Sequence, residues 1–211
     1  HQMKTPLAGM RMQSELALRQ VDPEEIHRSL EQLAKSSESA TRLVNQLLAL
    51  ARAENQPHAG LAFEEIELGA LARATVQDWV QASFAHAIDL GYEAQDEPVV
   101  IAGHALMLRE LLSNLIDNAL RYTPAGGRVT VSCGPGAGAG AGSVLRVEDN
   151  GPGIPEAIAD QVFEPFVSGR ENGTGLGLAL VSKIAADHGA GLRLDSRPGR
   201  TVVRLSLPLA G

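Results

Sequence analysis

The chain has 211 residues, of which 44% are hydrophobic, enough to bury a core in one large domain or in two small ones. Its 25 acidic and 18 basic side chains give a net charge of -7 without a basic run, which argues against nucleic acid as a partner. The single cysteine, Cys133, excludes an internal disulfide and a cysteine metal cluster. No apolar run reaches the roughly 20 residues that span a bilayer, so we expect a soluble, cytoplasmic stretch.

Residues 1–53 predict a pair of helices joined at a corner. From Ile26 to Ala51, apolar or small residues alternate at three and four positions, as in a coiled-coil seam, and a shorter seam precedes the corner. Asp22 suits an N-cap, and Pro23 suits the first helical position. Because two such helices bury their apolar faces poorly alone, we expect a helical hairpin that forms a four-helix bundle in a homodimer.

Residues 54–62 break the heptad pattern and predict a linker, and residues 63–211 predict a second domain. Short alternating runs in it predict strands, and longer periodic runs predict helices. The predicted strands are 63–68, 88–93, 99–101, 128–133, 144–148, 192–195 and 201–207, and the predicted helices are 68–86, 104–121 and 176–188. The fold class is therefore α+β, a helical hairpin followed by an α/β sandwich with helices on a mixed sheet.

The predicted helix 104–121 carries an unusual polar face. Asn114, Asn118, Arg121 and Tyr122 recur at i, i+4, i+7 and i+8, which places them on one side. Amide oxygens suit a hard cation such as Mg²⁺ that also binds phosphates, and Arg121 would neutralise those phosphates. Taken alone, an asparagine pair on a helix is more often solvated surface.

An acidic residue ends the predicted strand 144–148, and a glycine turn follows at once. A buried Asp149 would need a donor, and the exocyclic amine of adenine is one. Gly151 and Gly153 would let the backbone approach a flat ring closely. The alternative is a simple Asp-Asn-Gly turn.

A glycine-rich loop leads into the predicted helix 176–188. The amides and the dipole at a helix N-terminus favour phosphate, and glycines let the backbone wrap around it. A glycine loop alone is weak support for such a site. Its candidate residues are Gly173, Thr174, Gly175, Leu176 and Gly177.

In this order, and with Val-Phe-Glu-Pro-Phe at 162–166, these segments resemble the N, G1, F and G2 boxes of the sensor histidine kinases of two-component systems. The matching segments cover residues 110–178, and the flanking strands also fit. The resemblance implies the Bergerat ATP-binding sandwich for residues 63–211. It further implies a mobile lid between Gly153 and Gly173, and ATP and Mg²⁺ as cofactors.

The resemblance also implies roles for the matching residues. Asp149 would hold adenine, and Asn118 would coordinate Mg²⁺. Asn114 and Arg121 would contact phosphates. The other residues implied at the nucleotide are Tyr122, Gly151, Gly153, Arg170, Gly173, Thr174, Gly175, Leu176 and Gly177.

The first seven residues, His-Gln-Met-Lys-Thr-Pro-Leu, match the family's H box, H-E-x-x-T/N-P-L. The resemblance implies that His1 takes the γ-phosphoryl group of ATP, which needs a neutral ring nitrogen with a lone pair. Thr5 lies one helical turn on, so its hydroxyl could orient a water against the phosphoryl group of a docked regulator. The catalytic set is therefore His1, Gln2 and Thr5.

Gln2 departs from the family pattern, because most members carry Glu or Asp there. An ionised carboxylate that accepts the imidazole N–H raises the basicity of the attacking nitrogen more than a neutral amide oxygen does. We expect autophosphorylation to be slower but not abolished, and Gln2→Glu to speed phosphohistidine formation. An unchanged rate in a labelling time course would contradict this.

Two other functions fit parts of the pattern. ATP hydrolases of the same fold, as in type II topoisomerases and mismatch-repair proteins, place a glutamate four residues before the magnesium-binding asparagine to activate water. Here that position is Asn114, which cannot act as a general base. A catalytically silent module that binds nucleotide or a regulator is the second alternative, and the complete N, G1 and G2 residues argue against it.

The resemblance implies a response-regulator receiver domain as partner, with an aspartate that receives the phosphoryl group from His1. Because nothing precedes His1 in the sequence, we expect a longer sensor with input and membrane segments upstream. The chain would be the cytoplasmic portion of a bacterial protein anchored in the inner membrane.

Overall fold

The computed structural model describes residues 11–12, 14–16, 18–19, 21–55, 63–94, 98–136, 142–169 and 174–209. The chain folds as two compact units, which divide between Arg52 and Ala53. Among the helices described, none combines the length and the apolarity needed to cross a bilayer.

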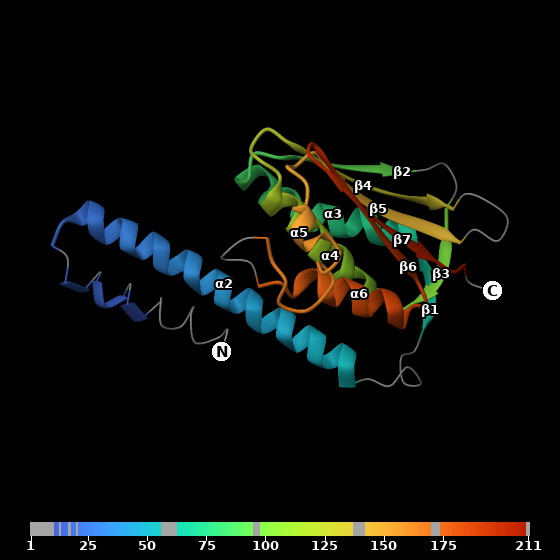
Figure 1. Cartoon of the computed structure of the whole chain (residues 1–211), viewed down its shortest axis with the longest axis horizontal. Helices are drawn as coiled ribbons and strands as arrows, with labels where there is room; N and C mark the ends of the chain where they lie inside the picture. The colour runs from blue at the N-terminus through green and yellow to red at the C-terminus, as the bar shows by residue number, and fades with distance from the viewer. Residues whose placement is uncertain are drawn as a thin grey trace. The chain divides into compact units, whose positions relative to one another are not determined.

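The N-terminal unit is helical. Its described positions between residues 11 and 19 are helical, and helix α2 (Pro23–Asn55) follows (Figure 1). Asp22 caps α2, because its Oδ1 accepts a hydrogen bond of 3.0 Å from the backbone N–H of Glu24. Glu24 and Glu25 occupy the first turn, where the helix dipole favours negative charge. The predicted corner at Asp22 and Pro23 is thus confirmed.

The second unit interleaves strands and helices. In chain order they are β1 (Glu64–Glu67), α3 (Leu68–Ala85), β2 (Asp89–Ala94), β3 (Val100–Gly103), α4 (Ala105–Tyr122), β4 (Arg128–Pro135), β5 (Ser143–Asp149), α5 (Glu156–Ala159), α6 (Gly177–Asp187), β6 (Gly191–Arg197) and β7 (Arg200–Leu207). The predicted strands and helices are confirmed to within a few residues, and the short helix α5 is an addition that the sequence pattern did not indicate.

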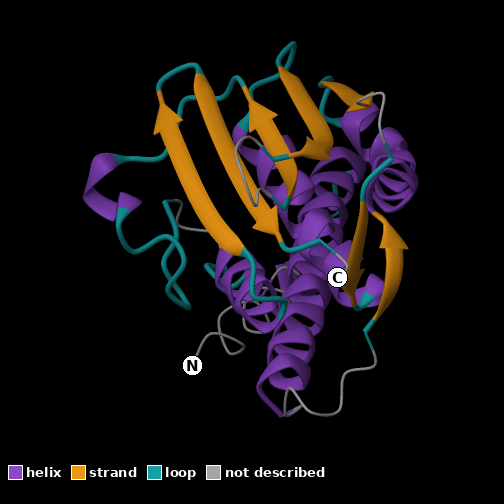
Figure 2. Ribbon diagram, turned by 90° about the vertical axis from the view of Figure 1, so that its right-hand side faces the viewer, coloured by secondary structure: helices purple, strands orange, loops and turns teal. Residues whose placement is uncertain are grey.

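Five strands form one mixed sheet in the order β2-β4-β5-β7-β6 (Figure 2). The pair β2 and β4 is parallel, and the other pairs are antiparallel. Helix α3 packs on β2 and β4, α4 on β4 and β5, and α6 on β6, so three helices back the sheet. Strands β1 and β3 pair separately as a small antiparallel ribbon. The predicted α/β sandwich is confirmed.

Strand β5 carries the core up to the candidate site. Its residues alternate between buried and half-buried, with Leu145 and Val147 facing the helices. The same period of two brings Asp149 onto the buried face, where it is 9% exposed. The strand thus ends with a carboxylate turned into the protein interior.

A buried histidine connects the ends of two site helices. His188, which follows α6, is 3% exposed, and its Nε2 accepts a hydrogen bond of 3.1 Å from the backbone N–H of His104, the N-cap of α4. Its Nδ1 lies 2.8 Å from the carbonyl oxygen of Ile184, which assigns the proton to Nδ1 in the neutral ring. The ring of Phe63 stacks on it with centroids 5.0 Å apart.

Acidification should destabilise the second unit through His188. Burial lowers the pKa of His188 below its ordinary value of 6.5, and nearby His104 lowers it further, while the Ile184 carbonyl and Asp187 act in the opposite direction. The unfolded chain therefore binds this proton at a higher pH than the folded chain does. The stabilisation is complete above about pH 6.5 and is lost below it, by up to about 1.4 kcal/mol for each pH unit.

Urea unfolding of the wild type and of His188→Gln at pH 7.5 and pH 5.5 measures this contribution. The variant should lose less stability on acidification than the wild type. His86→Gln, at an exposed position, is the matched control and should keep the wild-type pH dependence. Equal acid sensitivity in all three proteins would contradict the assignment to His188.

Candidate functional site

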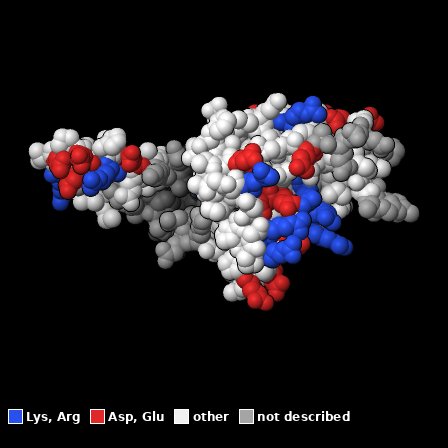
Figure 3. All heavy atoms as spheres, turned by 90° about the horizontal axis from the view of Figure 1, so that it is seen from above, with Lys and Arg blue, Asp and Glu red and all other residues white. Residues whose placement is uncertain are grey.

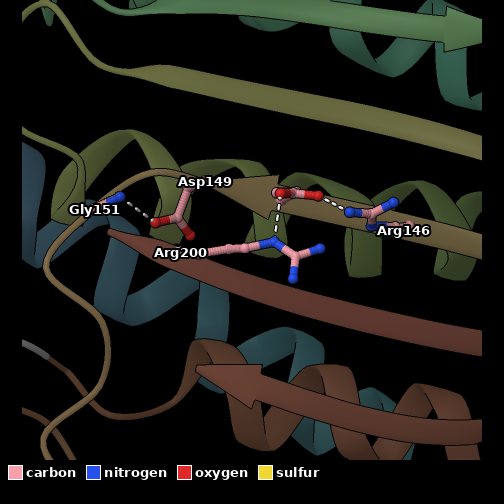
Figure 4. A network of polar contacts seen from close by, with 5 residues as sticks. Arg146, Asp149, Gly151 and Arg200 are labelled. Atoms are coloured by element: carbon pink, nitrogen blue, oxygen red, sulfur yellow. Dashed lines mark hydrogen bonds and ion pairs between the residues drawn. The ribbon is translucent and has the colours of Figure 1, made fainter. Parts of the chain in front are cut away.

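The turn after β5 holds the Asp149 carboxylate. Asp149 Oδ1 accepts a hydrogen bond of 2.9 Å from the backbone N–H of Gly151 (Figure 4). A Cβ atom on Gly151 would lie 2.8 Å from that same oxygen and 3.2 Å from the carbonyl oxygen of Tyr122. Gly151 is therefore required for the close approach of the turn to the end of α4. That this glycine also makes room for a flat ring, as expected from the sequence, stays a prediction.

The next glycine brings the turn against the β6–β7 hairpin. Gly153 has φ +83°, and a Cβ on it would lie 2.8 Å from the carbonyl group of Arg197. The Gly199 N–H donates to the Gly151 carbonyl at 2.9 Å, and the Ile154 N–H donates to Ser196 Oγ at 2.8 Å. The turn is thus held between α4 and two strands of the sheet.

Few of the described groups stabilise the negative charge of Asp149. Burial raises its pKa, while the hydrogen bond from the Gly151 N–H and the nearby Thr123 hydroxyl lower it. Its direct neighbours across the sheet are Val129 on β4 and Thr201 on β7. Within the part of the chain that the structure describes, Asp149 forms no ion pair. A buried carboxylate without a cation can accept a hydrogen bond from a ligand.

The adjacent acid, Glu148, is paired with cations. It points to the opposite face of the sheet, where it forms ion pairs with Arg146 and with Arg200, the latter at 2.8 Å (Figure 4). Acidic and basic side chains are interspersed over the face shown in Figure 3. Of the two neighbouring acids, only Asp149 is both buried and without a cation among the described residues.

Helix α4 carries the four polar residues whose spacing predicted a shared face, and the surroundings of these four side chains differ. Asn114 is buried, and its Nδ2 donates to the Glu110 carbonyl at 2.8 Å and to the Glu110 carboxylate at 3.3 Å. Asn118 and Tyr122 are half-buried. Arg121 Nε donates to Asp117 at 2.9 Å. The side chain of Arg121 is 38% exposed and that of Asp117 18% exposed, so the guanidinium keeps access to solvent on one side.

The glycine-rich loop meets the backbone of the segment 162–166. Gly175 has φ +64°, and a Cβ on it would lie 2.5 Å from the carbonyl carbon of Phe166. The Phe166 N–H donates to the Gly175 carbonyl at 2.9 Å. Thr174 Oγ1 accepts from the Leu176 N–H at 3.4 Å, and α6 then begins at Gly177 without a side-chain cap. Its first backbone N–H groups are suited to an anion.

Five predicted site residues, His1, Gln2, Thr5, Arg170 and Gly173, lie outside the described residues. The structure brings Asp149, Gly151 and the end of α4 together, and it joins the glycine-rich loop to residue 166. It adds two residues that the sequence reasoning missed. Thr123 follows Tyr122 directly, but no local pattern indicates that its hydroxyl reaches Asp149, and Asp117 pairs with Arg121.

Comparisons with known families agree with this architecture. Residues 1–56 match the His Kinase A (phospho-acceptor) domain. Residues 103–211 match the histidine kinase-, DNA gyrase B- and HSP90-like ATPase family. The second match covers more than half of the chain and contains α4, the turn after β5 and the start of α6.

Individual proteins resemble the whole chain. The probable sensor histidine kinase TcrY of Mycobacterium tuberculosis is 39% identical over 224 aligned residues, which cover 100% of this chain and 44% of TcrY. The solved structure of Acinetobacter baumannii histidine kinase AdeS covers 100% of this chain and 98% of its own, with TM-score 0.73 and 22% identity. Histidine kinase ThkA, solved in complex with response regulator protein TrrA, has TM-score 0.80 and 20% identity, and the match covers 100% of this chain and 59% of that one.

The chain thus spans less than half of the length of TcrY. Its family follows from the matched ATPase domain, which contains the candidate site, from the phospho-acceptor domain before it and from the identity with TcrY. The chain belongs to the sensor histidine kinases of two-component systems.

Proposed function

We propose that this chain is the kinase core of a sensor, which uses ATP to phosphorylate His1 and passes the phosphoryl group to an aspartate of a response regulator. The observation that carries the proposal is the Asp149 carboxylate, which is buried, has no cation among the described residues and lies in a glycine turn that leaves no space for a Cβ. An exocyclic amine such as that of adenine would satisfy it.

The residues around this turn suit a magnesium nucleotide. Within the described ranges, the half-buried amide of Asn118 has no hydrogen-bond partner in the protein, so its oxygen is available to a hard cation. The uncapped start of α6 at Gly177 and the guanidinium of Arg121 suit the phosphates. Asn114 would act beside them through its amide oxygen, while its Nδ2 donates to the Glu110 carbonyl.

Bound Mg²⁺ would neutralise negative charge on the phosphates as the γ-phosphoryl group transfers. The protein's task is then to orient the phosphoryl group in line with the His1 ring nitrogen. A bond forms between that nitrogen and phosphorus as the bond to the β-phosphate oxygen breaks, and ADP leaves. Gln2 would orient the imidazole ring.

The phosphoryl group would next pass to the regulator. The complex of ThkA with TrrA shows that a kinase of this fold can be bound by a response regulator, and we extend that partnership to this chain. Thr5 would assist the opposing phosphatase reaction, in which a water attacks the regulator's acyl phosphate and releases inorganic phosphate and the free aspartate. We further propose a homodimer through residues 1–53, a linker at 54–62, a catalytic domain at 63–211 and attachment to a bacterial inner membrane through segments outside this sequence.

Incubation with γ-labelled ATP tests the proposal against its rivals. A kinase places acid-labile, alkali-stable label on the protein. An ATP hydrolase of the same fold would release free phosphate without labelled protein, and a silent docking module would bind nucleotide without either product. Asn114 in place of a carboxylate, with the nearby Glu110 hydrogen-bonded to it, favours transfer over hydrolysis.

A further inference from the structure

Thr123, the C-cap residue that directly follows α4, has a buried hydroxyl. The residue is 6% exposed, and its backbone N–H donates to the Ala119 carbonyl at 3.0 Å. Its Oγ1 is buried, yet it makes no geometrically complete hydrogen bond within the described part of the chain. A buried hydroxyl left unpaired is costly, so proteins keep few of them without a functional reason.

Two glycines border Thr123. A Cβ on Gly127 would lie 2.2 Å from the methyl carbon of Thr123, so the methyl group fills the space beside Gly127. A Cβ on Gly151 would lie 3.5 Å from the Thr123 Cα. Asp149 Oδ1 lies beside the same Cβ position on Gly151, at 2.8 Å from it, and the Thr123 hydroxyl lowers the pKa of Asp149 without making a complete hydrogen bond among the described residues.

This inference rests on the nucleotide site proposed above. We propose that Thr123 is a positioning residue, whose hydroxyl completes a hydrogen bond to Asp149 when an adenine nucleotide binds and keeps that carboxylate ionised and oriented toward the adenine amine. Hydrogen bonds of this kind are often long or misaligned in unliganded sites and tighten in the complex.

The other described neighbours of Asp149 offer it no second hydrogen bond from a side chain. Gly151 supplies one backbone N–H to the carboxylate, at 2.9 Å. Val129, opposite on β4, has no polar side chain, and Thr201, opposite on β7, lies 3.2 Å from Ser196 Oγ in a hydroxyl pair. Among the described groups, no charged side chain contributes to the pKa of Asp149. Thr123 is therefore the side-chain donor that can hold the negative charge.

Removal of the Thr123 hydroxyl should change how adenine binding depends on pH. Burial raises the pKa of Asp149 and the Thr123 hydroxyl lowers it, so loss of that hydroxyl raises the pKa further. Adenine binding, which needs the ionised carboxylate, should then decline at a higher pH in Thr123→Val than in the wild type. At the acid end of the range the variant should bind about tenfold more weakly or worse, and the difference should shrink toward pH 8.

Calorimetric titration of the full 211-residue chain with Mg²⁺ and ADP from pH 5 to pH 8 measures this. Comparison with the wild type at each pH cancels the titration of ADP itself. Thr123→Ser, which keeps the hydroxyl, should restore the wild-type profile. Thr75→Val is the matched control, because Thr75 is also buried but donates within α3 to the Leu71 carbonyl at 2.8 Å.

An affinity loss of the same size at every pH would overturn the proposal, because it would place Thr123 in contact with the nucleotide or in packing alone. An unchanged profile would also overturn it. Should Thr123→Val not fold, Thr123→Cys, with a weaker donor, must shift the profile in the same direction. A wild type that binds no Mg²⁺-ADP at any pH would instead refute the proposed nucleotide site itself.

Discussion

Replacement of His1 by glutamine should reduce the rate at which γ-labelled ATP labels the chain by about 10³-fold or more. The acceptor must offer a lone pair on a neutral nitrogen, and the amide nitrogen of glutamine has its lone pair delocalised into the carbonyl group. The side chain remains polar and of similar length, so the substitution is conservative in size and polarity. The measurement is acid-labile, alkali-stable label on the protein after incubation with Mg²⁺ and γ-labelled ATP.

Two comparisons distinguish a lost acceptor from a damaged kinase. His1→Gln should bind Mg²⁺-ADP as the wild type does, because all residues of the proposed nucleotide site belong to the second unit. His27→Gln, at an exposed position on α2, should retain full labelling. Label that persists in His1→Gln would show that the phosphoryl group goes to another residue, and would refute the assignment of His1.

Replacement of Asp149 by asparagine should weaken adenine-nucleotide binding by about 30- to 150-fold, equivalent to about 2 to 3 kcal/mol. The change removes the charged acceptor, and an asparagine that keeps the Gly151 bond through its oxygen would turn its NH₂ group toward the adenine amine. Autophosphorylation at subsaturating ATP should fall with the affinity. Calorimetry with Mg²⁺-ADP at pH 7.5 measures the binding directly.

The matched control is Asp195→Asn, an exposed acid on β6 of the same sheet. It removes the same charge from the same domain and should bind Mg²⁺-ADP with wild-type affinity. Equal losses in both variants would mean that the overall charge of the domain, rather than Asp149, sets the affinity. Wild-type affinity in Asp149→Asn would exclude this carboxylate from the base site.

Local sequence signals predicted much of the fold, because each signal acts within a few residues. Asp22 and Pro23 mark the start of α2 through capping and a fixed φ, which need no distant partner. The period-two pattern of 144–148 likewise predicts a half-buried strand and an Asp149 that ends it. The separate β1–β3 ribbon and helix α5 were not predicted, because pairing partners and short helices depend on tertiary contacts.

The site divides in the same way. The sequence alone determined which residue types are present and how they are spaced, including the two asparagines of α4, the acid at the end of β5 and the glycines that follow it. Only the tertiary structure decided which groups meet. Thr123 lies near Asp149, and Gly175 lies against the backbone of Phe166. No periodic pattern in the sequence links the segments that carry these residues. Strand pairing and close packing bring them together, because the order of strands in the sheet, rather than the order of residues in the chain, determines which atoms are neighbours.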